Sequence, residues 1–181
     1  TNLSMLAMER GATAREAILV MGSLAEKYGY SDGGEELSVA DPYEAWIFEI
    51  IGPGPLWQVG DDEPGAFWVA QRVPDGHVAA SANTPVIDVV NFDDPENFLF
   101  APGIKEYAIA QGWWAADSKE PFSWRRHFLA QQSVETCERR IWRVMTLCNP
   151  DLVGKLDETN LPFSVPVKNQ LTLADLMDIN A

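Results

Sequence analysis

Residues 36–51, ELSVADPYEAWIFEII, decide the fold, because they read as two strands joined by a tight turn. The Asp41-Pro42 pair is a turn dipeptide: the aspartate side chain accepts bonds from the following backbone, and proline fixes φ. Beyond the turn the residues alternate between two faces. One face carries the large apolar side chains of Trp46, Phe48 and Ile50. The stretch therefore predicts an antiparallel hairpin of residues 36–40 with residues 44–51.

A helix is predicted before this hairpin, over residues 14–28. Thr13 and Glu16 have the spacing of a capping box at its start. Apolar residues then recur at helical spacing as far as Gly29, a residue type that suits the position after a last turn. A shorter helix is predicted over residues 3–10.

More strands and then more helices are predicted after the hairpin. The expected strands are residues 67–73, 77–82 and 86–90. Helical features follow at the Asp94-Pro95 pair, at residues 104–111, at residues 134–148 with Ser133 as N-cap, and after Thr172, with residues 162–167 extended. The order helix, antiparallel sheet, helices predicts one α+β domain over residues 1–181, with the sheet flanked by helices.

The chain is strongly acidic, with a formal net charge of -14. Such a surface repels nucleic-acid phosphates and anionic membranes, so neither is expected as a partner. Two basic pairs, Arg125-Arg126 and Arg139-Arg140, are interpreted as salt-bridged or solvated helix faces.

Two cysteines, Cys137 and Cys148, fall on the apolar side of one predicted helix. Eleven residues of helix separate them by roughly 16 Å, whereas a disulfide needs Cα atoms within about 7 Å. We therefore expect them not to pair with each other. No Cys/His cluster with metal-ligand spacing is present, and no cofactor is predicted. No run of about 18 apolar residues predicts a membrane span.

Several ordered motifs resemble the central part of the dipeptidase A-type peptidases. They are TAREAILVMGSLAEKYGY at residues 13–30, VADPYEAWIFEIIGPG at 39–54, FWVAQRVPDGHVAASAN at 67–83, DDPENFLFAPGIKEYAIAQGWW at 93–114 and LPFSVPVKNQLTLADLMDINA at 161–181. The resemblance covers nearly the whole chain, and several motifs in order are far more specific than any one of them.

This resemblance implies an αββα sandwich of the N-terminal-nucleophile hydrolases, present here in part. In that family a processed amino-terminal cysteine attacks the dipeptide bond, and its own α-amino group, which titrates near pH 7.7–8, acts as base. This sequence has no such cysteine. We therefore expect it to be an internal part of a larger hydrolase, inactive alone. Thr1 is an alternative nucleophile, although the residues after it read as helix rather than as a buried strand.

Asn83 is the leading candidate site residue. Its ANTP context also resembles the NSP element of choloylglycine hydrolases and penicillin V acylases, in which the asparagine helps to hold the oxyanion. An amide NH₂ at a strand end is a neutral donor for developing negative charge; the alternative is an Asx-turn before Pro85. Arg72 is the second candidate, facing the active site or a substrate carboxylate, with a structural ion pair to Glu49 or Asp75 as the alternative.

Other conspicuous residues are interpreted as structural. Core packing is expected for Cys137 and Cys148 and for Trp46 and Trp68, and a Cys–His catalytic pair is the alternative for the cysteines. His77 is expected to be a surface or core histidine, with a general base as the alternative, and His127 is assigned to packing or a cap. The acidic loop at Asp61-Asp62-Glu63 is expected to be solvated rather than a cation site. Trp113-Trp114 are expected in a core or interface, with a substrate pocket as the alternative.

The sequence thus predicts part of a bacterial cysteine-type dipeptidase whose substrate is a dipeptide or small amide. One alternative is an amidase acting on non-peptide C–N bonds, and another is a non-catalytic, secernin-like binding or assembly protein. The remainder of the same polypeptide is an expected partner, and a homo-oligomer is left open. Two cysteines fit a cytoplasmic, periplasmic or secreted location equally.

Overall fold

The computed structural model describes residues 2–128 and 135–179. The chain forms two compact units, which we call the sheet unit (Thr1–Arg72 with Ile87–Ala130) and the second unit (Val73–Val86 with Gln131–Ala181). Single-domain organisation over residues 1–181 stays a prediction. Ser133 as an N-cap and Thr1 as a nucleophile lie outside the described residues.

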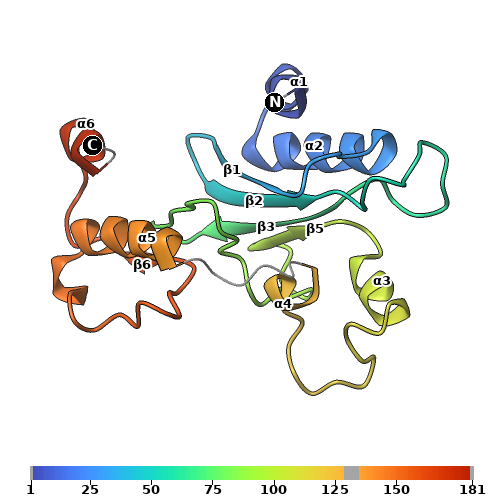
Figure 1. The fold of residues 1–181 in the computed structure, drawn as a ribbon. Coiled ribbons are helices and arrows are strands. Elements are labelled where there is room, and N and C mark those ends of the chain that lie inside the picture. Colours follow the sequence, from blue (N-terminus) through green and yellow to red (C-terminus); the bar gives the residue numbers. More distant parts are fainter. Residues whose placement is uncertain (1, 129–134, 180–181) are drawn as a thin grey trace. The chain divides into compact units, whose positions relative to one another are not determined.

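The sheet unit is built on a four-stranded sheet in the order β1-β2-β3-β5 (Figure 1). Its strands are β1 (Glu35–Ala40), β2 (Ala45–Ile51), β3 (Phe67–Val73) and β5 (Phe98–Phe100). β1 and β2 pair antiparallel across the turn, with Leu37 opposite Phe48, and β5 pairs antiparallel with β3. The hairpin prediction is therefore confirmed.

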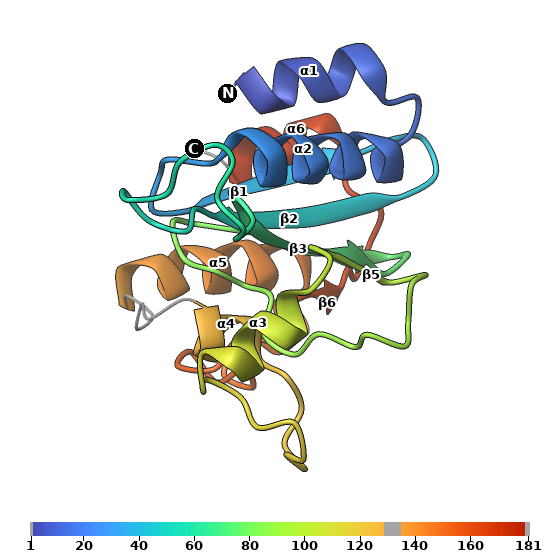
Figure 2. The same ribbon diagram turned by 90° about the vertical axis from the view of Figure 1, so that its right-hand side faces the viewer.

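Helix α2 (Ala14–Tyr28) covers one face of this sheet (Figures 1 and 2). It begins as predicted, with Thr13 Oγ1 accepting a hydrogen bond from the Glu16 N–H at 3.2 Å. Gly22 of α2 lies against the Trp68 indole so closely that a Cβ there would overlap the ring. Helix α1 (Asn2–Arg10) lies on the side of α2 away from the sheet.

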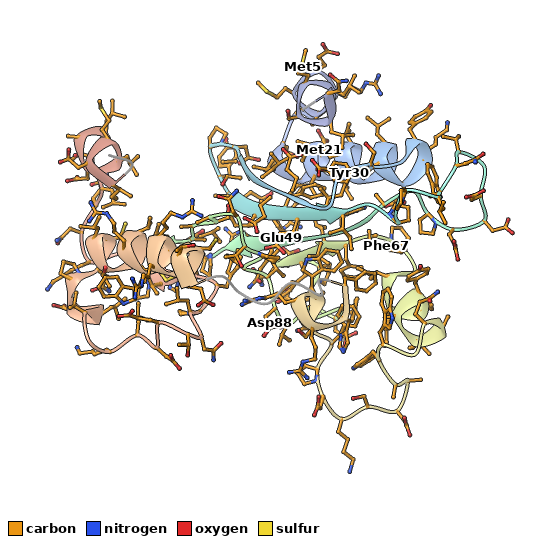
Figure 3. The ribbon with its side chains drawn as sticks, viewed as in Figure 1. Met5, Met21, Tyr30, Glu49, Phe67 and Asp88 are labelled. Carbon is orange, nitrogen blue, oxygen red and sulfur yellow. The ribbon has the colours of Figure 1, made fainter. Side chains whose placement is uncertain are left out.

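The opposite face of the sheet carries an aromatic cluster with helices α3 (Ile104–Ala110) and α4 (Trp124–Phe128). Phe67 of β3 packs against Tyr107 and Phe128, with ring centroids 4.4 and 5.1 Å away. Figure 3 shows Met21 on the α2 side of the sheet and Glu49 on the other side. The two faces therefore follow the alternation read from the sequence, and both are packed.

The second unit contains little regular strand. It consists of β4 (His77–Val78), α5 (Glu135–Cys148), the 3₁₀ turn η1 (Pro150–Leu152), β6 (Val165–Pro166) and α6 (Leu173–Ile179). β4 pairs antiparallel with β6. Ile141, Met145 and Val165 form its buried core, and half-buried apolar residues of the 78–86 segment pack around them. Thr172 caps α6 as predicted, accepting a hydrogen bond from the Asp175 N–H.

Three sequence predictions are wrong in detail. The predicted strand over 77–82 ends at Val78, because alanine and serine have little side chain to pack on a sheet. Residues 86–90 form only an isolated bridge, Val89 to Ser123. Asp94 begins a turn rather than a helix: its carbonyl accepts hydrogen bonds from the Asn97 and Phe98 N–H groups, and β5 follows.

The architecture that results is α+β, an antiparallel sheet flanked by helices. This coarse part of the fold prediction is confirmed. It leaves the two candidate residues in different units, with Arg72 near the end of β3 and Asn83 in the second unit.

Candidate functional site

Asn83 has an unusual backbone conformation. Its φ is 58°, and among the described residues it is the one non-glycine residue with positive φ. Asparagine tolerates this left-handed region better than most residues, but the region still disfavours a side chain with a Cβ. The residue lies in irregular backbone after β4, so the prediction that a strand end positions it is wrong. A helix positions it instead.

Arg140 of α5 fixes the Asn83 side chain. Its Nη1 and Nη2 atoms both donate to Asn83 Oδ1 at 3.1 Å, and Nη2 also donates to the Ala82 carbonyl at 2.8 Å. A guanidinium has donors and no acceptor, so the amide atom that faces it is the oxygen. The Asn83 Nδ2 group therefore points away from Arg140, and within the described residues it has no hydrogen-bond partner.

The Arg140 side chain is itself held on its helix. Nε donates to the Thr136 carbonyl at 3.4 Å, and Nη2 lies 3.4 Å from Cys137 Sγ. Cys137 Sγ in turn lies 3.7 Å from the Asn83 carbonyl oxygen. Because a cation bonded to Oδ1 draws electron density from the amide, the Nδ2–H bonds become stronger donors. The arrangement can present an oriented, polarised NH₂ group to an anionic or carbonyl oxygen.

Arg140 is the functional candidate that the sequence reasoning missed, since it was interpreted as part of a salt-bridged or solvated basic pair. The available signal was its position three residues after Cys137 and next to Ile141, at the border of the apolar stripe of the helix. A border arginine can reach a neighbouring loop while its stem packs on apolar surface.

Arg72 is engaged in an ion pair of the sheet unit. Its Nε lies 3.5 Å from Glu44 Oε2, and an ion pair with Glu49 or Asp75 stays a prediction. Glu44 also accepts hydrogen bonds from Arg15 Nε, at 3.1 and 3.2 Å. Glu44 is only 14% exposed, and one carboxylate therefore serves two half-buried arginines. This geometry is that of a structural network joining α2, β3 and the residue before β2.

Glu49 is a buried carboxylate of β2, 2% exposed. Oε1 accepts the Ile87 N–H at 2.9 Å, and Oε2 accepts the Trp124 indole N–H at 2.8 Å. Both partners lie on the α4 side of the sheet, where Figure 3 shows Glu49. Its two oxygens thus hold a backbone segment and a core tryptophan, which is a structural task.

The histidines also have structural contacts. His77 Nδ1 lies 3.0 Å from Ser164 Oγ within the second unit. His127 Nδ1 accepts the Ser123 N–H at 3.3 Å near the start of α4, and burial lowers the pKa of His127. The cap interpretation of His127 is confirmed.

Four of the residues predicted to pack in the core are buried as expected. Cys137 and Cys148 are free and buried, which confirms core packing for both; burial raises the pKa of Cys148, with Asp175 adding to the shift. Trp46 and Trp68 are 1% and 2% exposed. Trp113 is 46% exposed and packs edge-on against Tyr107 and Phe128, as a margin of the aromatic cluster.

The acidic loop makes local turn contacts. Asp61 accepts the Gln58 N–H at 2.9 Å through its side chain. Over residues 2–128 and 135–179, no group of three or more His, Cys, Asp or Glu side chains is arranged to hold a metal ion. In the same residues, no helix combines the length and apolar character that crossing a bilayer requires.

Comparison with known proteins places this α+β chain in a family. Peptidase family C69 matches residues 1–180, so the chain belongs to that family. A probable dipeptidase of Latilactobacillus sakei is 26% identical over 166 residues, which is 91% of this chain and 32% of that protein. A probable dipeptidase A of Streptococcus pyogenes serotype M3 is 28% identical over 167 residues, 91% of this chain and 33% of the relative. Dipeptidase A of Lactobacillus helveticus is 25% identical over 168 residues, again 91% of this chain and 32% of the relative. The chain thus spans about a third of the length of these curated relatives.

Proposed function

We propose that the whole protein is a cysteine-type dipeptidase, and that residues 1–181 contribute part of its active site. The observation that carries this proposal is the match to peptidase family C69 over residues 1–180, with relatives that bear dipeptidase names. The substrate is a dipeptide, and the bond cleaved is its single amide.

The proposed nucleophile is an amino-terminal cysteine outside this sequence, whose α-amino group takes the thiol proton. Cys137 and Cys148 do not suit that role, since both are buried on α5 and neither is an amino terminus. The complete protein would have the αββα sandwich of N-terminal-nucleophile hydrolases. Residues 1–181 would be an internal part of it and inactive alone.

Asn83 is proposed to stabilise the oxyanion. When the thiolate adds to the peptide carbonyl, the oxygen becomes negative, and an oriented NH₂ donor stabilises that charge more than it stabilises the ground-state carbonyl. The Arg140 contact to Oδ1 supports this role, because it fixes which side of the amide carries the donors. Binding of the substrate carboxylate by Arg72 stays a prediction, and Glu44 competes for that guanidinium.

The test is hydrolysis by the protein expressed from its complete reading frame. Unblocked dipeptides should be cleaved, and a variant with the amino-terminal cysteine replaced by alanine should lose turnover. Cys148→Ala is the matched control, since it removes a buried thiol that lies at the end of α5 and not at an amino terminus.

Each other outcome selects a different function. Cleavage of non-peptide amides without dipeptide cleavage would identify an amidase. An inert residue at the processed amino terminus, with no hydrolysis of either substrate class, would identify a non-catalytic binding protein.

A further inference from the structure

An open groove runs beside the outer strand of the sheet unit. It lies between α1, α2 and β1, and its apolar lining includes Met8, Met21, Leu37 and Val39. Met8 is 85% exposed, an unusual state for a long apolar side chain at the margin of an apolar groove. The groove therefore offers apolar surface that the described residues leave uncovered.

β1 forms one wall of this groove and is the terminal strand of the four-stranded sheet. A terminal strand presents alternate backbone N–H and C=O groups outward, ready to pair with another strand. None of its six residues is buried, whereas five of the seven residues of neighbouring β2 are. The low burial of β1 leaves its outer edge accessible to a further strand.

The usual protection of an edge strand is missing from the last four of the six residues of β1. Leu37, Ser38, Val39 and Ala40 include no lysine and no proline, and the six pairs with β2 run in register without a bulge. Native edges are normally blunted by charge, proline or bulges. We infer that β1 is not an edge in the complete protein.

We propose that an extended segment of the same polypeptide, from outside residues 1–181, pairs with β1 and fills the groove beneath α1. Leu37 and Val39 lie opposite Phe48 and Trp46, so they belong to the face of the sheet that α2 covers. The added strand should therefore carry apolar side chains at every second position, directed toward Met8 and Met21.

Two observations favour the same polypeptide over a second copy. The curated relatives are about three times as long as the matched region, which leaves ample chain to supply a strand at high effective concentration. Full-length antiparallel pairing of β1 with β1 of a second copy would place Glu35 of one chain opposite Ala40 of the other, next to Asp41, and each chain has a net charge of -14. The proposed surface is independent of the catalytic proposal.

Hydrogen exchange of the full-length protein tests the pairing. If a strand covers β1, consecutive amides of residues 37–40 should all exchange at least about tenfold more slowly than open amides. If β1 is a true edge, slow and fast amides should alternate along these residues, and that alternation would overturn the proposal.

Photo-crosslinking identifies the occupant. A benzoylphenylalanine in place of Met8, in the full-length protein, should crosslink to a peptide outside residues 1–181. Tyr43 is the matched control, since it is 88% exposed at the turn of the same hairpin and does not line the groove; its probe should not capture that peptide. Mixing ¹⁴N- and ¹⁵N-labelled protein separates the sources. Crosslinks that join ¹⁴N- and ¹⁵N-labelled chains would mean that a second copy occupies the groove. The absence of any crosslink from the Met8 position would mean that the groove is open. Either result contradicts the proposal.

Discussion

Two arginines, one in each unit, contact different kinds of acceptor through their guanidinium groups. Arg72 of the sheet unit meets a carboxylate, Glu44, which Arg15 also contacts. Arg140 of the second unit meets neutral oxygens, those of the Asn83 amide and the Ala82 carbonyl. The Glu44 carboxylate offsets the positive charge of Arg72. The Asn83 and Ala82 oxygens are neutral, so the positive charge of Arg140 can polarise the amide that it contacts.

Under the proposed function, this difference separates a structural arginine, Arg72, from one that orients a site residue, Arg140. An ion pair between two secondary-structure elements stabilises their packing, and this role requires no substrate. Arg140 instead binds the side-chain amide oxygen of Asn83, whose backbone is in the left-handed region. This contact orients the Asn83 NH₂ group, which has no partner among the described residues. We therefore expect variants around Arg140 to affect turnover, and variants around Arg72 to affect stability. All variants below concern the full-length protein.

The largest effect is expected from Asn83→Gly. Glycine adopts a φ of 58° without strain, so the backbone stays while the amide is removed. Loss of one oxyanion donor should lower kcat by about 10²–10³-fold, measured by dipeptide hydrolysis. Asn160→Gly, an exposed asparagine of the same unit, should leave kcat unchanged. Turnover of Asn83→Gly within about twofold of wild type would remove the oxyanion role.

Arg140→Gln should come next, with kcat lowered by roughly 10–100-fold and KM little changed. The amide would lose its fixed orientation, and a misplaced donor acts mainly where charge develops. Arg140→Lys should recover only part of the loss, since an ammonium lacks the planar fork. Arg143→Gln, an exposed arginine one turn further along α5, is the control. A rise in KM at constant kcat would instead indicate uniform substrate binding.

Glu44→Gln should lower the free energy of unfolding by about 1.5–3 kcal/mol, because two arginines lose a shared charged acceptor. Chemical denaturation measures this, and kcat per folded molecule should stay close to wild type. Glu96→Gln removes a carboxylate that is 87% exposed and 3.7 Å from Arg15, so it should change stability by less than about 0.5 kcal/mol. A large fall in kcat for Glu44→Gln would show that the Arg72 network contributes to turnover, and it would contradict the distinction drawn between Arg72 and Arg140.

The smallest effect concerns acid stability at Asp41. Hydrogen bonds from the Ala14, Tyr43 and Glu44 N–H groups lower the pKa of this carboxyl. A folded-state pKa below the unfolded value, about 3.9, stabilises the fold above that pH, and the contribution is lost as pH falls through the lower value. Asp41→Asn should therefore weaken the decline in thermal stability below about pH 4. An unchanged decline in the Asp41→Asn variant would contradict this prediction.

Local signals explain the parts of the fold that the sequence predicts well. Helix α2 has the predicted bounds because its cap and its apolar spacing lie within the element itself. Strand β3 likewise spans the predicted residues 67–73. In both cases residues that are close in sequence determine the conformation.

The remaining elements depend on partners far along the chain. β5 has three residues and forms because it pairs with residues 69–71 of β3. The turn residues at Asp94 give no indication of this pairing. β4 forms by pairing with Val165 and Pro166 of β6. At the site, the ANTP stretch marks Asn83, but its support comes from Arg140, fifty-seven positions later. A single sequence gives no indication of that pairing.

The buried carboxylate of Glu49 has a consequence for how the chain folds. Its two acceptor bonds reach Ile87 and Trp124, which lie 38 and 75 residues away in sequence. Contacts of such separation require large loops to close before they stabilise anything, so they slow folding. The Ile87 amide and the Trp124 indole N–H should therefore gain protection late and in the same kinetic phase, well after the hydrogen bonds within α2.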